Sequence, residues 1–136
     1  MATTTASESG PQLSVDDLLI SADSHVAEPY DLWTTRLPKG LRDQAPTFPS
    51  AESAQSKPGG LDPNERVKEM AVDGVSLEVL YATKGMTLFR IEDVALQKAC
   101  VRVFNDWLIE FCAVSPNRLF GIALTSLQRG PRRGRA

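Results

Sequence analysis

Three short apolar runs, separated by helical patterns, dominate the middle of the chain. They predict three strands, over residues 16–26, 75–82 and 119–124. The first run holds Leu18, Leu19 and Ile20 in succession, which is typical of a strand buried in a parallel sheet. Because helices separate the strands, we expect right-handed crossovers and an α/β fold with a parallel sheet.

The two helices between these strands carry clear end signals. Asp62 is expected to cap the first helix, with Pro63 in its first turn and Gly74 at its end. The second helix is the longest, and the apolar spacing predicts that it covers residues 92–114. Each helix therefore has an apolar face that can pack against the sheet.

A shorter helix and a long irregular segment follow the first strand. Pro29 suits the first turn of a helix that carries Trp33 and ends near Pro38. Residues 41–61 are rich in Pro, Gly and Ser, and predict a connection longer than most. This segment is expected to be a functional loop, a covering flap or an ordinary surface loop.

The composition limits the classes of function. A chain of 136 residues, 42% hydrophobic and 24% charged, has the size and composition of one globular domain. Residues 129–136 hold four of the 15 basic residues, and the rest has 11 basic and 17 acidic residues, a net charge of −6. An acidic body predicts no nucleic-acid partner. No apolar run reaches about 18 residues, which predicts no membrane span. The first residues also lack a secretory signal pattern, so a cytoplasmic location is expected.

The two cysteines are not expected to pair or to act as nucleophiles. Cys100 and Cys112 both fall in the long helix, where 12 residues separate them by about 18 Å. A disulfide needs Cα atoms within about 7 Å, so buried reduced thiols are expected. His25 is the single histidine of the chain, and it cannot be matched to a Ser–His–Asp or Cys–His arrangement.

Candidate chemistry gathers at the end of the first predicted strand, in the sequence Asp23-Ser24-His25. Successive side chains of a strand alternate between faces, so Asp23 and His25 are expected to point the same way. A carboxylate and an imidazole at this spacing can hold one divalent metal ion. On the pattern alone, a strand-end pair that only forms hydrogen bonds is the more frequent outcome.

Three segments together carry a family resemblance. They are ISADSHVAEPYDLWTTRLP, RVKEMAVDGVSLEVLYATKGM and ACVRVFNDWLIEFCAVSPNRLFGIALTSLQ. In this order and spacing they resemble the amidohydrolase-related (amidohydrolase 2) family over roughly residues 18–128. That family includes metal-dependent hydrolases and the aminocarboxymuconate-semialdehyde and resorcylate-type decarboxylases. The resemblance implies a (β/α)₈ TIM barrel with its site at the C-terminal ends of the strands.

The resemblance also implies roles for particular residues. Asp23 and His25 stand where the family carries metal ligands, so a zinc or manganese site is expected there. The family completes this site with a histidine and an aspartate from later strands, and this sequence has neither, so metal binding is expected to be weak or absent. Tyr81, Thr83 and Lys84 follow the second strand, where barrel loops contact a small-molecule substrate, or serve as ordinary turn residues. Glu28 is expected to cap the short helix rather than to be a third ligand.

The extent of the resemblance defines the expected organisation. Residues 1–13 are expected to be a disordered tail, residues 14–128 a partial barrel of about three of the eight strand units, and residues 129–136 a basic tail outside the family. The barrel is not closed in this chain, so we expect an N-terminal fragment of frameshift origin that oligomerises or needs a complementary chain. The expected function is a metal-dependent hydrolase. The alternatives are a carboxy-lyase acting on an unsaturated or aromatic carboxylic acid, a non-catalytic truncated product, or an anion-binding adaptor acting through the arginine tail.

Overall fold

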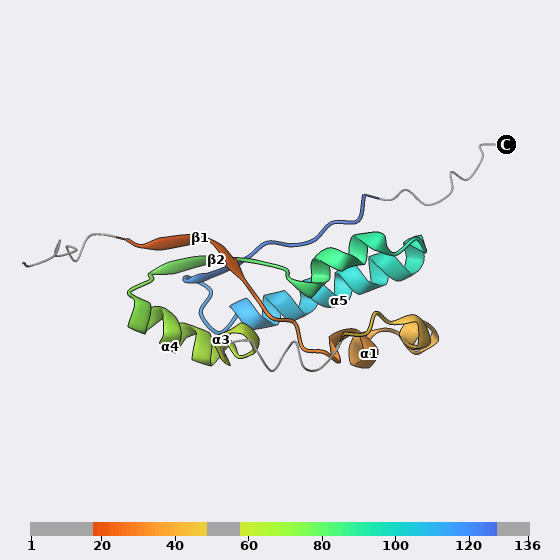
Figure 1. Cartoon of the computed structure of the whole chain (residues 1–136), viewed down its shortest axis with the longest axis horizontal. Helices are drawn as coiled ribbons and strands as arrows, with labels where there is room; N and C mark the ends of the chain where they lie inside the picture. The colour runs from red at the N-terminus through yellow and green to blue at the C-terminus, as the bar shows by residue number, and fades with distance from the viewer. Residues whose placement is uncertain (1–17, 49–57, 128–136) are drawn as a thin grey trace, which may run out of the picture.

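A three-stranded parallel sheet forms the centre of the fold. The computed structural model describes residues 18–48 and 58–127 of the chain. The strands are β1 (Ile20–His25), β2 (Leu77–Tyr81) and β3 (Leu119–Gly121), and each lies beside the next in the order β1-β2-β3 (Figure 1). The predicted α/β class with three parallel strands is confirmed. The predicted tails 1–13 and 129–136 lie outside the described residues.

Helices connect the strands. They are α1 (Leu32–Arg36), η1 (Lys39–Gln44), α3 (Pro58–Leu61), α4 (Pro63–Asp73), η2 (Lys84–Arg90) and α5 (Val94–Cys112), of which η1 and η2 are 3₁₀-helices. The longest, α5, has 19 residues. No helix within 18–48 and 58–127 is both long enough and apolar enough to cross a membrane.

The predicted helix ends are present. Asp62 caps α4 by accepting a hydrogen bond from the Asn64 backbone N–H at 2.8 Å, and Gly74 ends the helix with a φ of 69°. The long helix predicted over residues 92–114 is α5, which covers Val94–Cys112, and Asp93 caps it because its Oδ1 accepts from the Leu96 N–H at 2.7 Å. These caps satisfy N–H groups that have no partner within the helix.

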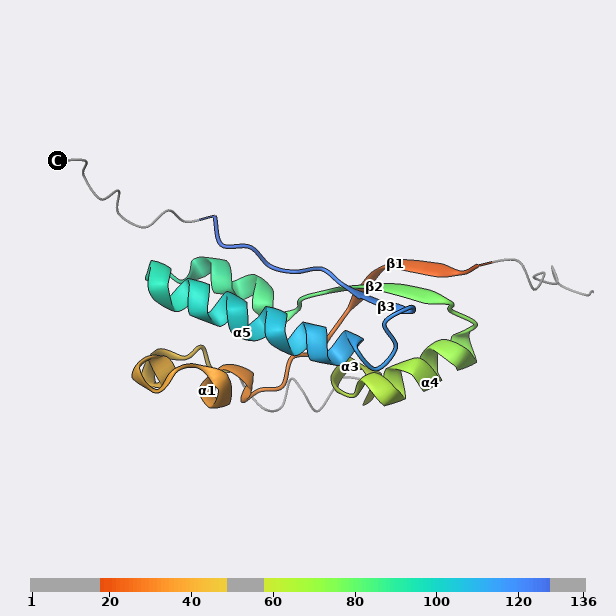
Figure 2. The ribbon, with the colours of Figure 1, turned by 180° about the vertical axis from the view of Figure 1, so that it is seen from behind.

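The hydrophobic core lies on one side of the sheet. Figures 1 and 2 both show α3 and α4 on one side of the strands, while η2 lies level with the strands, beyond the C-terminal end of β2. Trp33 of α1 is fully buried against α5, where its Nε1 donates a hydrogen bond to the Cys100 carbonyl at 3.0 Å. Leu80 of β2 and Phe104 of α5 are fully buried as well. The sheet is therefore packed on one face and open on the other.

The first apolar run is not buried as predicted. Leu18, Leu19 and Ile20 are 70%, 45% and 51% exposed. The prediction of a buried run is wrong, because Leu18 and Leu19 precede β1, and Ile20 begins this edge strand on the face that no described helix covers. Phe120 and Ile122, on or beside β3, are exposed for the same reason.

Replacing Gly74 by alanine is expected to lower the free energy of unfolding by about 1 kcal/mol. An added Cβ at Gly74 would meet no heavy atom within 4 Å, so the cost comes from the left-handed backbone alone. Gly40 is the matched control, because its Cβ would also meet nothing within 4 Å and its φ is not positive. Urea denaturation compares the two variants, and equal stabilities would contradict the prediction.

Candidate functional site

A β-bulge in β1 shapes the end of this strand. Ser21 pairs with Glu78 and Ser24 with Leu80, so two residues of β1 lie opposite the single residue between Glu78 and Leu80. The two serine side chains meet on the helix side, with their Oγ atoms 2.7 Å apart. Such a bulge turns the strand and redirects its side chains.

Asp23 and His25 project on the open side of the sheet. Their side chains are 88% and 53% exposed, and Oδ1 of Asp23 lies 3.5 Å from Nε2 of His25. The structure thus brings the two residues together, at the C-terminal end of β1. The His25 ring also lies beside Tyr81, with 6.0 Å between the ring centroids.

A backbone carbonyl orients the His25 ring. Nδ1 of His25 lies 3.1 Å from the Ala82 carbonyl oxygen, which can only accept a hydrogen bond. Nε2 lies further, 3.5 Å, from its own acceptor, the Asp23 carboxylate, so the shorter contact favours the neutral ring with its proton on Nδ1 and its lone pair on Nε2. Histidines that bind metals are held in this way, with the other ring nitrogen donating to a carbonyl or carboxylate.

This arrangement fits two ligands of one metal ion. Zinc lies about 2.0–2.2 Å from nitrogen and oxygen ligands, so one ion can span donor atoms that are 3.5 Å apart. A stable site usually has at least three protein ligands. Within the described residues, no group of three or more His, Cys, Asp or Glu side chains could hold a metal ion. Asp23 and His25 therefore supply part of a ligand set.

Glu28 has a different partner from the one expected. Its carboxylate is fully buried and accepts hydrogen bonds from the backbone N–H groups of Thr83, Lys84 and Gly85 at 2.9–3.0 Å. The N-cap of α1 is Asp31, which makes no side-chain capping bond. The prediction that Glu28 caps the short helix is wrong, because its side chain reaches across to the free N–H groups after β2. Both its oxygens are thereby occupied, so it adds no third ligand.

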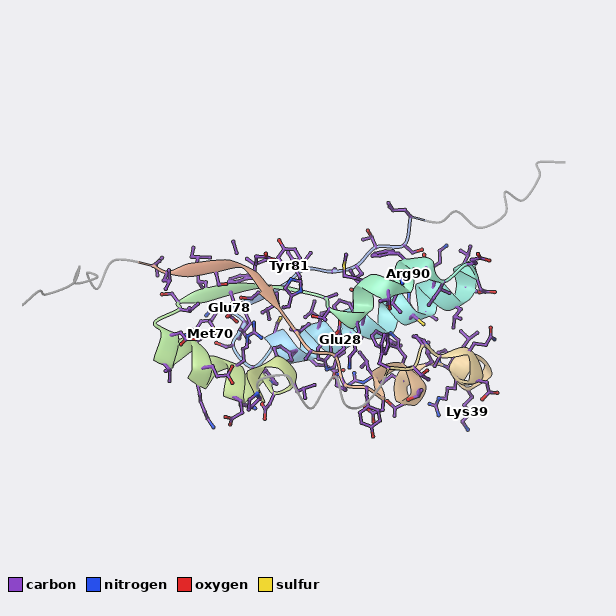
Figure 3. The ribbon with its side chains drawn as sticks, in the orientation of Figure 1. Glu28, Lys39, Met70, Glu78, Tyr81 and Arg90 are labelled. Atoms are coloured by element: carbon purple, nitrogen blue, oxygen red, sulfur yellow. The ribbon has the colours of Figure 1, made fainter. Side chains whose placement is uncertain are left out.

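The predicted substrate-binding residues fall into two groups. Tyr81 is exposed on the same open side as His25, and Figure 3 shows it away from the helices. Thr83 and Lys84 are tied into the fold: Thr83 Oγ1 donates to the Val26 carbonyl at 2.8 Å, and Lys84 Nζ to the Glu28 carbonyl at 3.1 Å. Their role in substrate binding stays a prediction, and Tyr81 is the best placed of the three.

A buried ion pair that no local sequence pattern marks joins α4 to β2. Arg66 of α4 donates through Nε to Glu78 of β2 at 2.6 Å, and both side chains are only 11% exposed. Arg66 Nη1 also donates to the His25 carbonyl at 2.9 Å. Figure 3 shows Glu78 on the helix side of the sheet, and a hollow of about 360 Å³ opens beside the pair. The sequence shows only one half of the pair, a glutamate within an apolar strand.

The cysteines are free thiols, as expected, and both are poor nucleophiles. Cys100 is buried, and Cys112 is half-buried. Burial raises the pKa of the Cys100 thiol to about 11 and also raises that of Cys112. At neutral pH both therefore stay protonated, and only the thiolate attacks efficiently.

Comparisons with known proteins identify the fold. No model of a protein family matches the chain, and no curated protein does. Among solved structures, an amidohydrolase from Mycobacterium avium subsp. paratuberculosis K-10 is similar, with a TM-score of 0.64 and 16% sequence identity. The match covers 84% of this chain and 44% of that one, so the chain spans less than half the length of this neighbour. The chain thus has an amidohydrolase-like fold, with three parallel strands of a TIM-barrel-like sheet that is not closed.

Replacing Glu78 by leucine is expected to cost about 3 kcal/mol of stability, because the Arg66 guanidinium would stay buried without its partner. The double variant Arg66→Met/Glu78→Leu should cost less than the sum of the two single changes. Urea denaturation of the unmodified chain, Arg66→Met, Glu78→Leu and the double variant measures the coupling energy between the two side chains. The exposed pair Arg36–Glu110 is the control, and Glu110→Gln should cost at most about 1 kcal/mol. Additive losses at Arg66 and Glu78 would contradict the prediction.

Thiol labelling tests the burial of Cys100. In the Cys112→Ala chain, we expect a disulfide reagent at pH 8 to label Cys100 only after urea unfolds the protein, because burial raises its pKa to about 11. In the Cys100→Ala chain, the half-buried Cys112 should react without denaturant, though more slowly than a free thiol. Fast labelling of Cys100 in the native protein would contradict this expectation.

Proposed function

We propose that this chain is part of a metal-dependent hydrolase of the amidohydrolase-related kind, with Asp23 and His25 as two ligands of a zinc or manganese ion. The observation that carries the proposal is the 3.5 Å contact between Asp23 Oδ1 and His25 Nε2, with the other ring nitrogen bonded to the Ala82 carbonyl. The pair lies at the C-terminal end of a parallel strand, which is where TIM barrels carry their sites. The amidohydrolase-like fold supports the same assignment.

Each residue near the pair has a distinct role in this proposal. Asp23 and His25 hold the metal ion, which when bound lowers the pKa of water or polarises a substrate carbonyl. Tyr81, beside the His25 ring, offers a flat face and a hydroxyl to a substrate on the open side of the sheet. Arg66 fixes the backbone of His25 through its carbonyl.

The remaining ligands must come from outside the described residues, because these contain no group of three metal-binding side chains. A complementary chain that covers the open face is the partner we propose, since exposed apolar residues such as Ile20, Phe120 and Ile122 line that side. Because the ligand set in the described residues is incomplete, we keep a second candidate: a non-catalytic chain that binds no metal by itself.

Metal titration separates the two candidates. If Asp23 and His25 are ligands, Mn²⁺ added to the full chain should broaden the NMR signals of the His25 ring selectively. His25→Ala and Asp23→Asn should each weaken Mn²⁺ binding about tenfold or more, since even partners one shell further out are worth about 10–100-fold. Mn²⁺ is chosen because it avoids thiolates, so the cysteines do not compete.

The control for this titration is Asp43→Asn, an exposed aspartate of η1. It should bind Mn²⁺ as the unmodified chain does. Equal binding by all variants would reject the metal site, and no binding by any variant would favour the non-catalytic candidate for the chain by itself.

A further inference from the structure

One peptide group links the candidate metal ligand to the buried carboxylate of Glu28. It is the peptide between Ala82 and Thr83, just after the end of β2. Its N–H, on Thr83, donates to Glu28 Oε1 at 3.0 Å, and its C=O, on Ala82, faces His25 Nδ1 at 3.1 Å. A peptide group is planar, so its two ends turn together. Whatever fixes the N–H therefore also fixes the direction of the carbonyl.

Glu28 holds this peptide firmly. Oε1 accepts from the Thr83 and Gly85 N–H groups, and Oε2 accepts from the Lys84 N–H, all at 2.9–3.0 Å. The carboxylate is fully buried, so water does not compete for these bonds. Bonds from backbone N–H groups to a carboxylate are also stronger than neutral ones.

The pairing of β1 with β2 does not by itself fix the direction of the Ala82 carbonyl. β2 ends at Tyr81, whose carbonyl accepts from the Val26 N–H at 3.0 Å, and Ala82 lies one residue beyond. Arg66 holds His25 through its backbone carbonyl rather than through a ring nitrogen. The orientation of the ring thus depends on a peptide that Glu28 clamps.

We propose that Glu28 is a positioning residue for His25. It aims the Ala82 carbonyl at Nδ1, which places the ring proton there and leaves the Nε2 lone pair beside Asp23. This tautomer rests on distance, because Nδ1 lies 3.1 Å from its acceptor whereas Nε2 lies 3.5 Å from the Asp23 carboxylate, which can also accept. Its meaning for metal binding rests on the proposed function. Without the clamp, the ring would populate both neutral tautomers, and Nε2 would carry a proton for part of the time.

The single histidine of the chain makes this proposal directly measurable. In the metal-free, ¹⁵N-labelled full chain, a long-range ¹H–¹⁵N spectrum contains one imidazole. We expect a protonated Nδ1 and an unprotonated Nε2 in the neutral ring. Glu28→Gln keeps the size of the side chain but turns an NH₂ group towards backbone donors. It should give a mixture of tautomers and weaken Mn²⁺ binding about tenfold.

Trp33→Phe is the matched control. It removes a buried hydrogen bond to the Cys100 carbonyl, away from His25, and should lower stability without changing the tautomer. If Glu28→Gln does not fold, Glu28→Asp, which withdraws the carboxylate by one methylene group, gives the same test. A wild-type ring protonated on Nε2 would overturn the proposal, and so would a folded Glu28 variant with the wild-type tautomer.

Different results would reject the positioning role of Glu28 and the proposed metal site. A Glu28-dependent tautomer in a chain whose Mn²⁺ binding does not depend on Asp23 and His25 would reject the proposed metal site and leave the positioning role in place. Mn²⁺ binding through Asp23 and His25 that is unchanged in a folded Glu28→Gln chain, with an unchanged tautomer, would reject only the positioning role.

Discussion

The buried carboxylate of Glu28 ties the two halves of the described structure together. It leaves the chain just after β1 and accepts three backbone N–H groups from residues 83–85, at the start of η2. Hydrogen bonds to a charged group contribute about 1.5–3 kcal/mol each, and a buried carboxylate without them would be costly. The crossover from β1, the turn after β2 and the direction of the Ala82 carbonyl therefore depend on one side chain. The core on one side of the sheet and the candidate ligands on the other meet at this point.

Local signals in the sequence predicted the elements well. Asp62 and Gly74 lie at the two ends of α4, as predicted, because capping involves only neighbouring residues. The three strands and their parallel order followed from apolar runs separated by helices. The meeting of Asp23 and His25 was also predictable, because a single residue separates them on the strand.

Features that depend on distant residues were not predictable. Glu28 finds its partners 55–57 residues later in the chain, and Arg66 finds Glu78 from another element, so no local pattern marks either contact. The bulge in β1 places an extra residue opposite β2. Counting alternate residues back from His25 therefore gives the wrong face of the sheet for residues before the bulge. The exposure of Leu18 follows from what covers the sheet, which the run of apolar residues does not specify.

The two outer strands of the sheet differ from each other, and this has a consequence for symmetry. In the described structure β1 and β3 pair only with β2, so each presents one unpaired edge. Copies of the chain that joined through these edges in parallel would bring unlike surfaces together, β3 of one against β1 of the next. A contact of this kind is heterologous, and it generates a closed ring when the rotation between copies closes and an open filament when it does not. A two-fold dimer would instead have to pair like edges antiparallel, β1 with β1 or β3 with β3, or use the exposed face of the sheet.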